Sequence, residues 1–296
     1  MRSCASLALL AGVAVPAAAQ VASRSVGSVT FRADLSQARP GGLIVATLHS
    51  RGRLGTAFAI LDGRRAPFYP SAQGPRALVP LPAESPPGPN TLGFELWARR
   101  GRQRIPLEVE IAPADYPPQS VSIPESKRAL LGSAEVVTES RELLLLVRTV
   151  SPERLGAFPF RAPVGRAPSE SFGSPRTWSG TAGAEVLMDG IFGDRHRGLD
   201  YDGAGQIAMA PAAGTVLLAG PRALTGGTVV LDHGQGIVSL FAHLSRVDAR
   251  AGERIETGAP IGLAGDTGLA YGPHLHWGVY LHGVAVDPRV FDSLSD

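Results

Sequence analysis

The stretch YGPHLH at residues 271–276 places two histidines two positions apart, where a predicted strand over residues 276–281 begins. Side chains alternate between the two faces of a strand, so the rings of His274 and His276 point to the same side. Neutral imidazole is the most common side-chain ligand of metal ions in proteins. The pair therefore suggests a metal site built on a β-sheet.

A second cluster, HRGLD at residues 196–200, supplies an imidazole and a carboxylate four positions apart. This spacing places His196 and Asp200 on one face of either a strand or a helix, but Gly193 and Gly198 argue against a helix. The helical HExxH signature of other metallopeptidases is absent. Two histidines and one aspartate match a catalytic zinc site, which has three protein ligands and one open position for water.

Other candidate groups have simpler interpretations. His233 and His282 stand in turn-like segments, DHGQG and LHG, so we expect both to be exposed to solvent. Ser239 lies in a plain strand pattern, and Cys4 lies in a segment that we expect to be removed. Nucleophilic catalysis therefore has little support.

The run from about residue 160 to 288 resembles the lysostaphin/LytM family of zinc metallopeptidases. Three family marks occur in order: HxxxD, a histidine after an aromatic-Ala pair (residues 241–243), and GPHLH. The flanking text also fits, with PVGR at 163–166, SFG at 171–173, GAPIG at 258–262 and GDTG at 265–268.

The resemblance implies specific roles for five residues. It makes His196, Asp200 and His276 the ligands of one zinc ion per chain. It leaves His243 and His274 unligated beside the open metal position. One of these two would help to deprotonate water, and the other would stabilise the oxyanion or protonate the leaving amine; the sequence does not divide these roles.

The first 19 residues have the pattern of a secretory signal: Arg2, an apolar stretch over residues 4–15, and the small residues AAA at 17–19. Cleavage after Ala19 leaves no cysteine, hence no disulfide. No later apolar run approaches the about 18 residues of a membrane span. We expect an exported protein of the periplasm or cell envelope.

Composition agrees with a globular enzyme of about two domains. The 296 residues carry 28 basic and 26 acidic side chains, a net charge of +2. The arginines are scattered rather than clustered, so the electrostatic pattern of a nucleic-acid-binding protein is missing.

We predict a mainly β fold with four segments. They are a signal peptide at 1–19, a small immunoglobulin-like β-sandwich at 20–113, a linker with one helix at 114–158, and a LytM-type antiparallel sheet at 159–296. The sandwich follows from short apolar runs and from the clean alternation of residues 104–111. The helix is predicted over residues 125–148, and the C-terminal strands over 214–218, 228–231, 237–243, 254–264 and 276–281.

The resemblance implies a zinc endopeptidase that cuts peptide stems or cross-links of bacterial peptidoglycan, and the signal pattern adds that the enzyme is exported. Two alternatives stay open: a noncatalytic LytM-like module that binds the wall or activates another hydrolase, and an enzyme acting on another extracellular protein. A long segment between Gly173 and His196 could cover the groove, and Asp189 or Asp194 could fill the fourth metal position in a latent form. The sequence identifies no regulatory partner.

Overall fold

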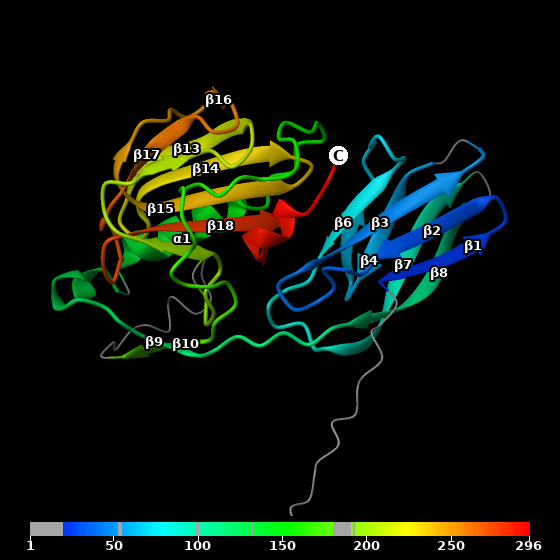
Figure 1. Cartoon of the computed structure of the whole chain (residues 1–296), viewed down its shortest axis with the longest axis horizontal. Coiled ribbons are helices and arrows are strands. Elements are labelled where there is room, and N and C mark those ends of the chain that lie inside the picture. The colour runs from blue at the N-terminus through cyan, green and yellow to red at the C-terminus, as the bar shows by residue number, and fades with distance from the viewer. Residues whose placement is uncertain (1–19, 53–54, 99–100, 132, 180–190, 192) are drawn as a thin grey trace, which may run out of the picture.

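A computed structural model describes residues 20–296 apart from 53–54, 99–100, 132, 180–190 and 192. It shows two β-rich bodies joined by a long extended segment and a helix (Figure 1). The prediction of a mainly β protein is confirmed. The predicted signal peptide lies outside the described residues. Among the described helices, none has the length and apolar character that a membrane crossing requires.

The N-terminal body is a β-sandwich of two four-stranded antiparallel sheets. Phe31 and Phe94, one from each sheet, stack in its core with ring centroids 4.4 Å apart. Residues Ile105, Leu107 and Val109 are buried between exposed neighbours, which is the predicted alternation. The strand order of the first sheet is β1 (Val21–Val26), β2 (Val29–Asp34), β3 (Leu43–Ser50), β6 (Arg76–Pro80). The strand order of the second sheet is β5 (Arg64–Pro67), β4 (Ala57–Leu61), β7 (Gly88–Ala98), β8 (Gly101–Ile111).

The connecting segment contains a short strand and two helices rather than one. Strand β9 (Gln119–Ser122) is followed by the 3₁₀ helix η1 (Glu125–Leu130) and by α1 (Ala134–Leu146). The predicted helix over 125–148 is interrupted because Leu131 is extended and Ser133 starts a new helix, where its hydroxyl accepts a hydrogen bond from the Val136 backbone. Helix α1 then buries Val136 and Leu143 in the C-terminal core.

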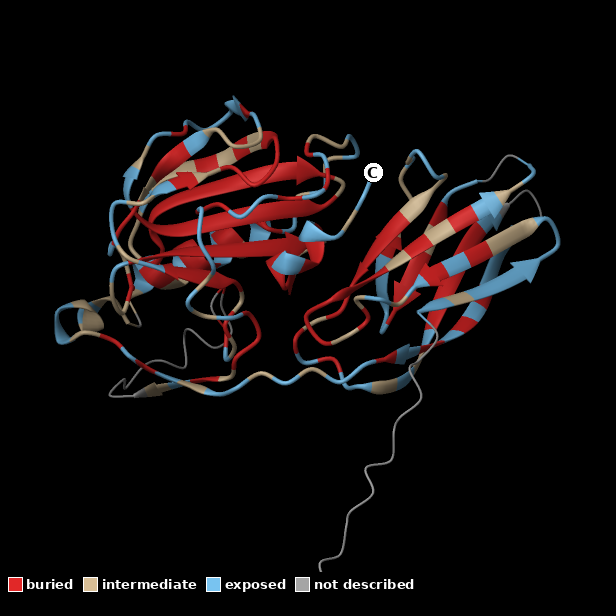
Figure 2. Cartoon of the chain, viewed as in Figure 1, coloured by how far each residue is buried: buried red, intermediate tan, exposed pale blue. Residues whose placement is uncertain are grey.

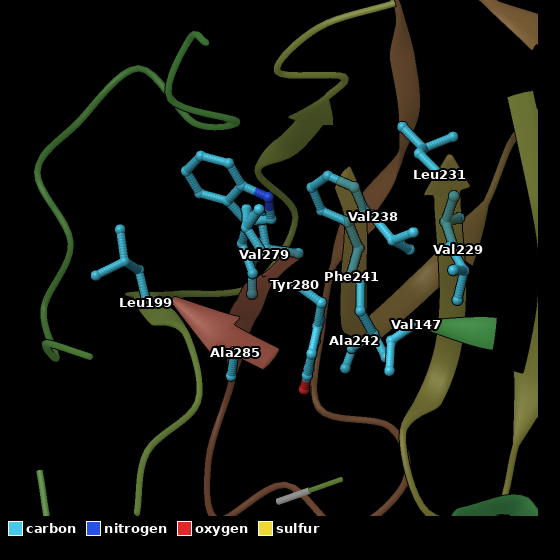
Figure 3. Packing of buried hydrophobic residues seen from close by; sticks show 14 of the residues in the cluster. Val147, Leu199, Val229, Leu231, Val238, Phe241, Ala242, Val279, Tyr280 and Ala285 are labelled. Atoms are coloured by element: carbon cyan, nitrogen blue, oxygen red, sulfur yellow. The ribbon is translucent and has the colours of Figure 1, made fainter. Parts of the chain in front are cut away.

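The C-terminal body is built on a nine-stranded sheet whose main path is antiparallel. Its central strands β14, β15 and β18 are buried along almost their whole length (Figure 2). Phe241 and Trp277 stack between neighbouring strands. Phe241 and Val279 belong to the buried cluster on this sheet (Figure 3). The main path is β11 (Leu199–Asp202), β18 (His274–Leu281), β15 (Ile237–Val247), β14 (Gly226–Gly234), β13 (Gly214–Arg222), β16 (Arg254–Ile255).

Shorter elements surround this sheet. The predicted strand over 254–264 is in fact two strands, β16 and β17 (Pro260–Ala264), and β17 pairs with β15. The others are β10 (Arg176–Ser179), β12 (Ile207–Met209), β19 (Val284–Val286) and the 3₁₀ helix η2 (Pro288–Asp292).

The two bodies pack against each other. Leu43 and Leu78 of the sandwich belong to the same buried cluster as the C-terminal core. The Asp287 backbone N–H donates to the carbonyl of Gly41 at 2.7 Å. The sandwich is thus in direct contact with the C-terminal body.

The expectation that His233 is exposed is wrong. Its side chain is fully buried, its Nδ1 lies 2.9 Å from the Ala213 carbonyl, and its Nε2 lies 2.8 Å from Oγ of Ser239. Strand β14 continues through His233 as far as Gly234, and the Phe160 ring packs edge-on against the His233 ring. His282 is also largely buried and stacks on Tyr69.

Candidate metal centre

The centre forms where β11 runs antiparallel to β18. The register pairs Asp200 with His276, so their side chains lie on the same face of the sheet. Oδ1 of Asp200 is 2.8 Å from Nδ1 of His276. Both side chains are buried.

His196 reaches the same point from the loop before β11. Its Nδ1 lies 2.9 Å from the Ser171 carbonyl and can donate a hydrogen bond to it, which orients the ring so that Nε2 faces the other two side chains. Nε2 is 3.0 Å from Oδ1 of Asp200 and 3.2 Å from Nδ1 of His276. The structure thus brings the three predicted ligands together.

These spacings fit a zinc ion. Ligand atoms about 2.0–2.1 Å from one tetrahedral ion lie about 3.3 Å from each other, close to the three observed separations. Two imidazole nitrogens and a carboxylate oxygen are also the donor types that zinc takes. Gly198 makes the geometry possible, because a Cβ there would lie 2.7 Å from Cε1 of His276. The residues present therefore fit the group that the sequence predicts.

Two further imidazoles stand beside the three. Nε2 of His274 is 3.9 Å from Oδ1 of Asp200, and its Nδ1 can donate to the Gly272 carbonyl at 2.8 Å. His243 lies near the end of β15 with a positive φ of 65°, and its Nδ1 faces the Thr267 carbonyl at 2.9 Å. The His243 and His274 rings are 4.7 Å apart. All five predicted site residues are thus gathered at one point.

Burial sets the protonation of this cluster. It lowers the pKa of His276 to about 4. It also holds the pKa of His243 well below its ordinary value, and the neighbouring His274 ring lowers it further. Burial alone raises the pKa of Asp200, but the facing His196 and His276 imidazoles outweigh this effect and hold the pKa well below its usual range. An ionised carboxylate and a neutral imidazole, as these directions give for Asp200 and His276, are the forms that bind a metal ion.

Two polar side chains without a predicted role, Tyr271 and Arg176, hold the other oxygen of Asp200, and a third, Glu170, contacts both of them. The Tyr271 hydroxyl lies 2.5 Å from Oδ2, and the Arg176 guanidinium 3.2 Å from it. Glu170 contacts both donors, at 2.8 Å from Tyr271 and 3.0 Å from Arg176. The only sequence signal was the position of Tyr271, immediately before GPHLH.

A narrow cavity opens beside the cluster. Its walls include Trp178 and Leu269 in addition to Arg176, Tyr271, and the three histidines 243, 274 and 276. Trp178 belongs to β10, which pairs in parallel with β9 of the connecting segment. Asp194, which the sequence offered as a fourth ligand, is exposed and lies 3.7 Å from Arg197. Asp189 and most of the predicted covering segment lie outside the described residues.

A buried cluster of His196, Asp200 and His276, with the His243 and His274 rings beside it on an antiparallel sheet, has the donor groups of a metallopeptidase centre. Comparisons with known proteins agree. Residues 194–288 match peptidase family M23. This part of the chain is an M23 peptidase domain, and the resemblance to the lysostaphin/LytM enzymes is confirmed.

Related proteins share this domain. An uncharacterized metalloprotease of Haemophilus influenzae is 38% identical over 95 residues, which are 31% of this chain and 20% of that protein. The peptidoglycan DD-endopeptidase ShyC of Vibrio cholerae is 33% identical over 98 residues, 33% of this chain and 23% of that protein. The chain therefore matches only about a fifth of the length of these relatives.

A solved structure extends the likeness to both bodies. The crystal structure of a peptidase M23 from Pseudomonas aeruginosa superposes with a TM-score of 0.64 and 29% sequence identity. The match covers 87% of this chain and 96% of that one. The combination of a sandwich with an M23 domain is therefore shared between the two proteins.

Proposed function

We propose that this chain is an exported zinc-dependent endopeptidase that hydrolyses peptide bonds in the stems or cross-links of bacterial peptidoglycan. The observation that carries the proposal is the convergence of three ligand atoms, from His196, Asp200 and His276, within 3.2 Å of one another. Zinc bound there supplies Lewis acidity, which lowers the pKa of water and polarises a peptide carbonyl.

The two remaining histidines move protons. If the Nδ1 proton of each ring is donated to a backbone carbonyl, Nε2 is the basic nitrogen of both His243 and His274. One ring accepts the proton of the attacking water, and the other donates to the leaving amine or stabilises the oxyanion. Their low exposure keeps both rings out of bulk solvent. Hydrogen bonds to reacting groups are stronger in such a buried site than in water.

No covalent intermediate is needed. The buried Ser239 hydroxyl, paired with His233, lies in the interior of the sheet with both residues fully buried. A peptide substrate has no access to that pair.

The substrate class follows from the relatives. ShyC is named for its action on peptidoglycan, and it shares the domain that holds all five site residues. A protein acting on this substrate works outside the cytoplasm, which agrees with the signal pattern of the first 19 residues.

Incubation of the protein lacking residues 1–19 with purified muropeptides, followed by mass spectrometry, tests this function. We expect cleaved stems or cross-links with the zinc-loaded protein, and none after removal of metal by a chelator. Restoring zinc should restore cleavage. A zinc-loaded protein that leaves every muropeptide intact would instead favour a noncatalytic wall-binding module.

A further inference from the structure

We propose that the buried Arg176 and the half-buried Tyr271 and Glu170 form a clamp that positions Asp200 for the metal and, through the Tyr271 ring, orients His274. The three are positioning residues, since they act through Asp200 and His274. The inference rests on the proposed metal site, and it adds roles that the sequence motifs do not assign.

The clamp controls which oxygen of Asp200 faces the imidazoles. Oδ2 lies within hydrogen-bonding distance of the Tyr271 hydroxyl at 2.5 Å and of the Arg176 guanidinium at 3.2 Å. Oδ1 faces Nε2 of His196 and Nδ1 of His276. Because the two donors occupy Oδ2, only Oδ1 is left for a metal ion. The carboxylate is thereby fixed as a ligand through one oxygen.

Charge explains why the clamp contains an arginine and a second carboxylate. Asp200 is fully buried, and the Arg176 side chain is only 4% exposed. A buried carboxylate needs paired donors, and a buried guanidinium needs more than one acceptor. Glu170 supplies the second acceptor at 3.0 Å. Removing any one member takes a hydrogen-bond partner from each of the other two or from Asp200.

The Tyr271 ring has a second contact. It stacks on His274 with centroids 4.8 Å apart and planes inclined by 22°. The same residue thus contacts a proposed ligand through its hydroxyl and a proposed proton-transfer group through its ring. These two contacts can be separated by substitution.

The connecting segment supports the clamp from the far side. Arg176 lies on β10 opposite Gln119 of β9, and its Nε donates to Oε1 of Gln119 at 3.3 Å. The guanidinium is therefore held between the connecting segment and the metal centre.

The test is zinc affinity, measured by chelator competition on the whole protein lacking residues 1–19. Tyr271→Phe removes one hydroxyl and keeps the ring, and Arg176→Gln removes the charge. We expect each to weaken zinc binding about 10- to 100-fold, the usual effect of losing an outer-sphere partner. Tyr201→Phe is the control, because it removes the same hydroxyl from a buried tyrosine that follows Asp200 in β11 and faces the other side of the sheet. It should bind zinc within about twofold of wild type.

Cobalt substitution gives a second readout. The visible absorption of bound Co²⁺ reports ligand geometry, and we expect it to change in Tyr271→Phe and not in Tyr201→Phe. With zinc saturating, Tyr271→Leu, which also loses the stack on His274, should lose more of the wild-type kcat on muropeptides than Tyr271→Phe.

The outcomes separate the two proposals. Wild-type zinc affinity in Tyr271→Phe overturns the clamp, whatever the activity. If Arg176→Gln does not fold, Tyr271→Phe decides alone. A wild-type protein that binds zinc but cuts no muropeptide overturns the proposed function, and the affinity series still judges the clamp. A wild-type protein that binds no zinc overturns both.

Discussion

Nδ1 of His276 lies 2.8 Å from Oδ1 of Asp200, although 76 residues separate the two in the chain. The antiparallel pairing of β11 with β18 produces this contact, and His196 completes the group. The metal centre thus depends on one strand register.

Replacing His276 with alanine should abolish stoichiometric zinc binding. It removes one of three ligands, so we expect a loss of affinity beyond the about 10- to 100-fold of an outer-sphere change. Metal analysis of the purified variant measures this. His282→Ala is the control: His282 directly follows β18 and lies outside the centre, so this variant should keep about one zinc per chain. Full zinc occupancy in His276→Ala would refute the ligand assignment.

Replacing His243 with alanine should separate metal binding from turnover. His243 contacts Thr267 and His274 and is not among the three converging ligands. We expect zinc content to stay at that of wild type, while kcat on muropeptides falls about 10²- to 10⁴-fold, the usual contribution of a proton-transfer group. Wild-type turnover in this variant would remove the proposed role.

Replacing Gly198 with alanine should damage the centre by crowding. A Cβ there would lie 2.5 Å from the Trp277 carbonyl and 2.7 Å from the His276 ring. We expect a loss of about 1–3 kcal/mol in the free energy of unfolding, together with weaker zinc binding. Chemical denaturation measures the first effect. Gly165→Ala is the control, since a Cβ at Gly165 meets nothing within 4 Å; equal stability of the two variants would argue against the close approach.

Acid should destabilise the fold through His233. Burial lowers its pKa to about 4 in the folded protein, below the ordinary 6.5 of the unfolded chain. The unfolded state therefore binds a proton first as pH falls. The stabilisation is complete above about pH 6.5 and is lost progressively down to about pH 4.

Between pH 7 and pH 5 this group should remove about 2 kcal/mol from the free energy of unfolding. Urea unfolding of the metal-free protein at the two pH values measures the change. His233→Gln should show a smaller pH dependence of the free energy of unfolding than wild type, because it lacks this group. Some dependence should remain, because the pKa values of His276 and His282 are also lowered in the folded protein. An unchanged pH dependence in this variant would contradict the assignment.

Much of the fold could be predicted because strand patterns are local. The alternation in residues 104–111 predicted β8, in which Ile105, Leu107 and Val109 are buried between exposed neighbours. Strands β1 and β2 were missed because each is only six residues long with half of them apolar, and β1 is largely exposed at the sheet edge.

Burial of polar residues was harder to predict. His233 has turn residues around it, but its neighbours in space are Ala213, Ser239 and Phe160. Arg176 and Glu170 belong to no sequence motif named above, and their role depends on the side chains that they contact after folding.

The amino-acid sequence by itself determined the strand pattern and the types and spacing of the five site residues, because these follow from local side-chain periodicity and from ligand chemistry. The tertiary structure alone decided that Asp200 faces His276, that Tyr271 and Arg176 hold the opposite oxygen, and that His233 is buried. These relationships join residues that are distant in the chain, and strand pairing and core packing bring them together.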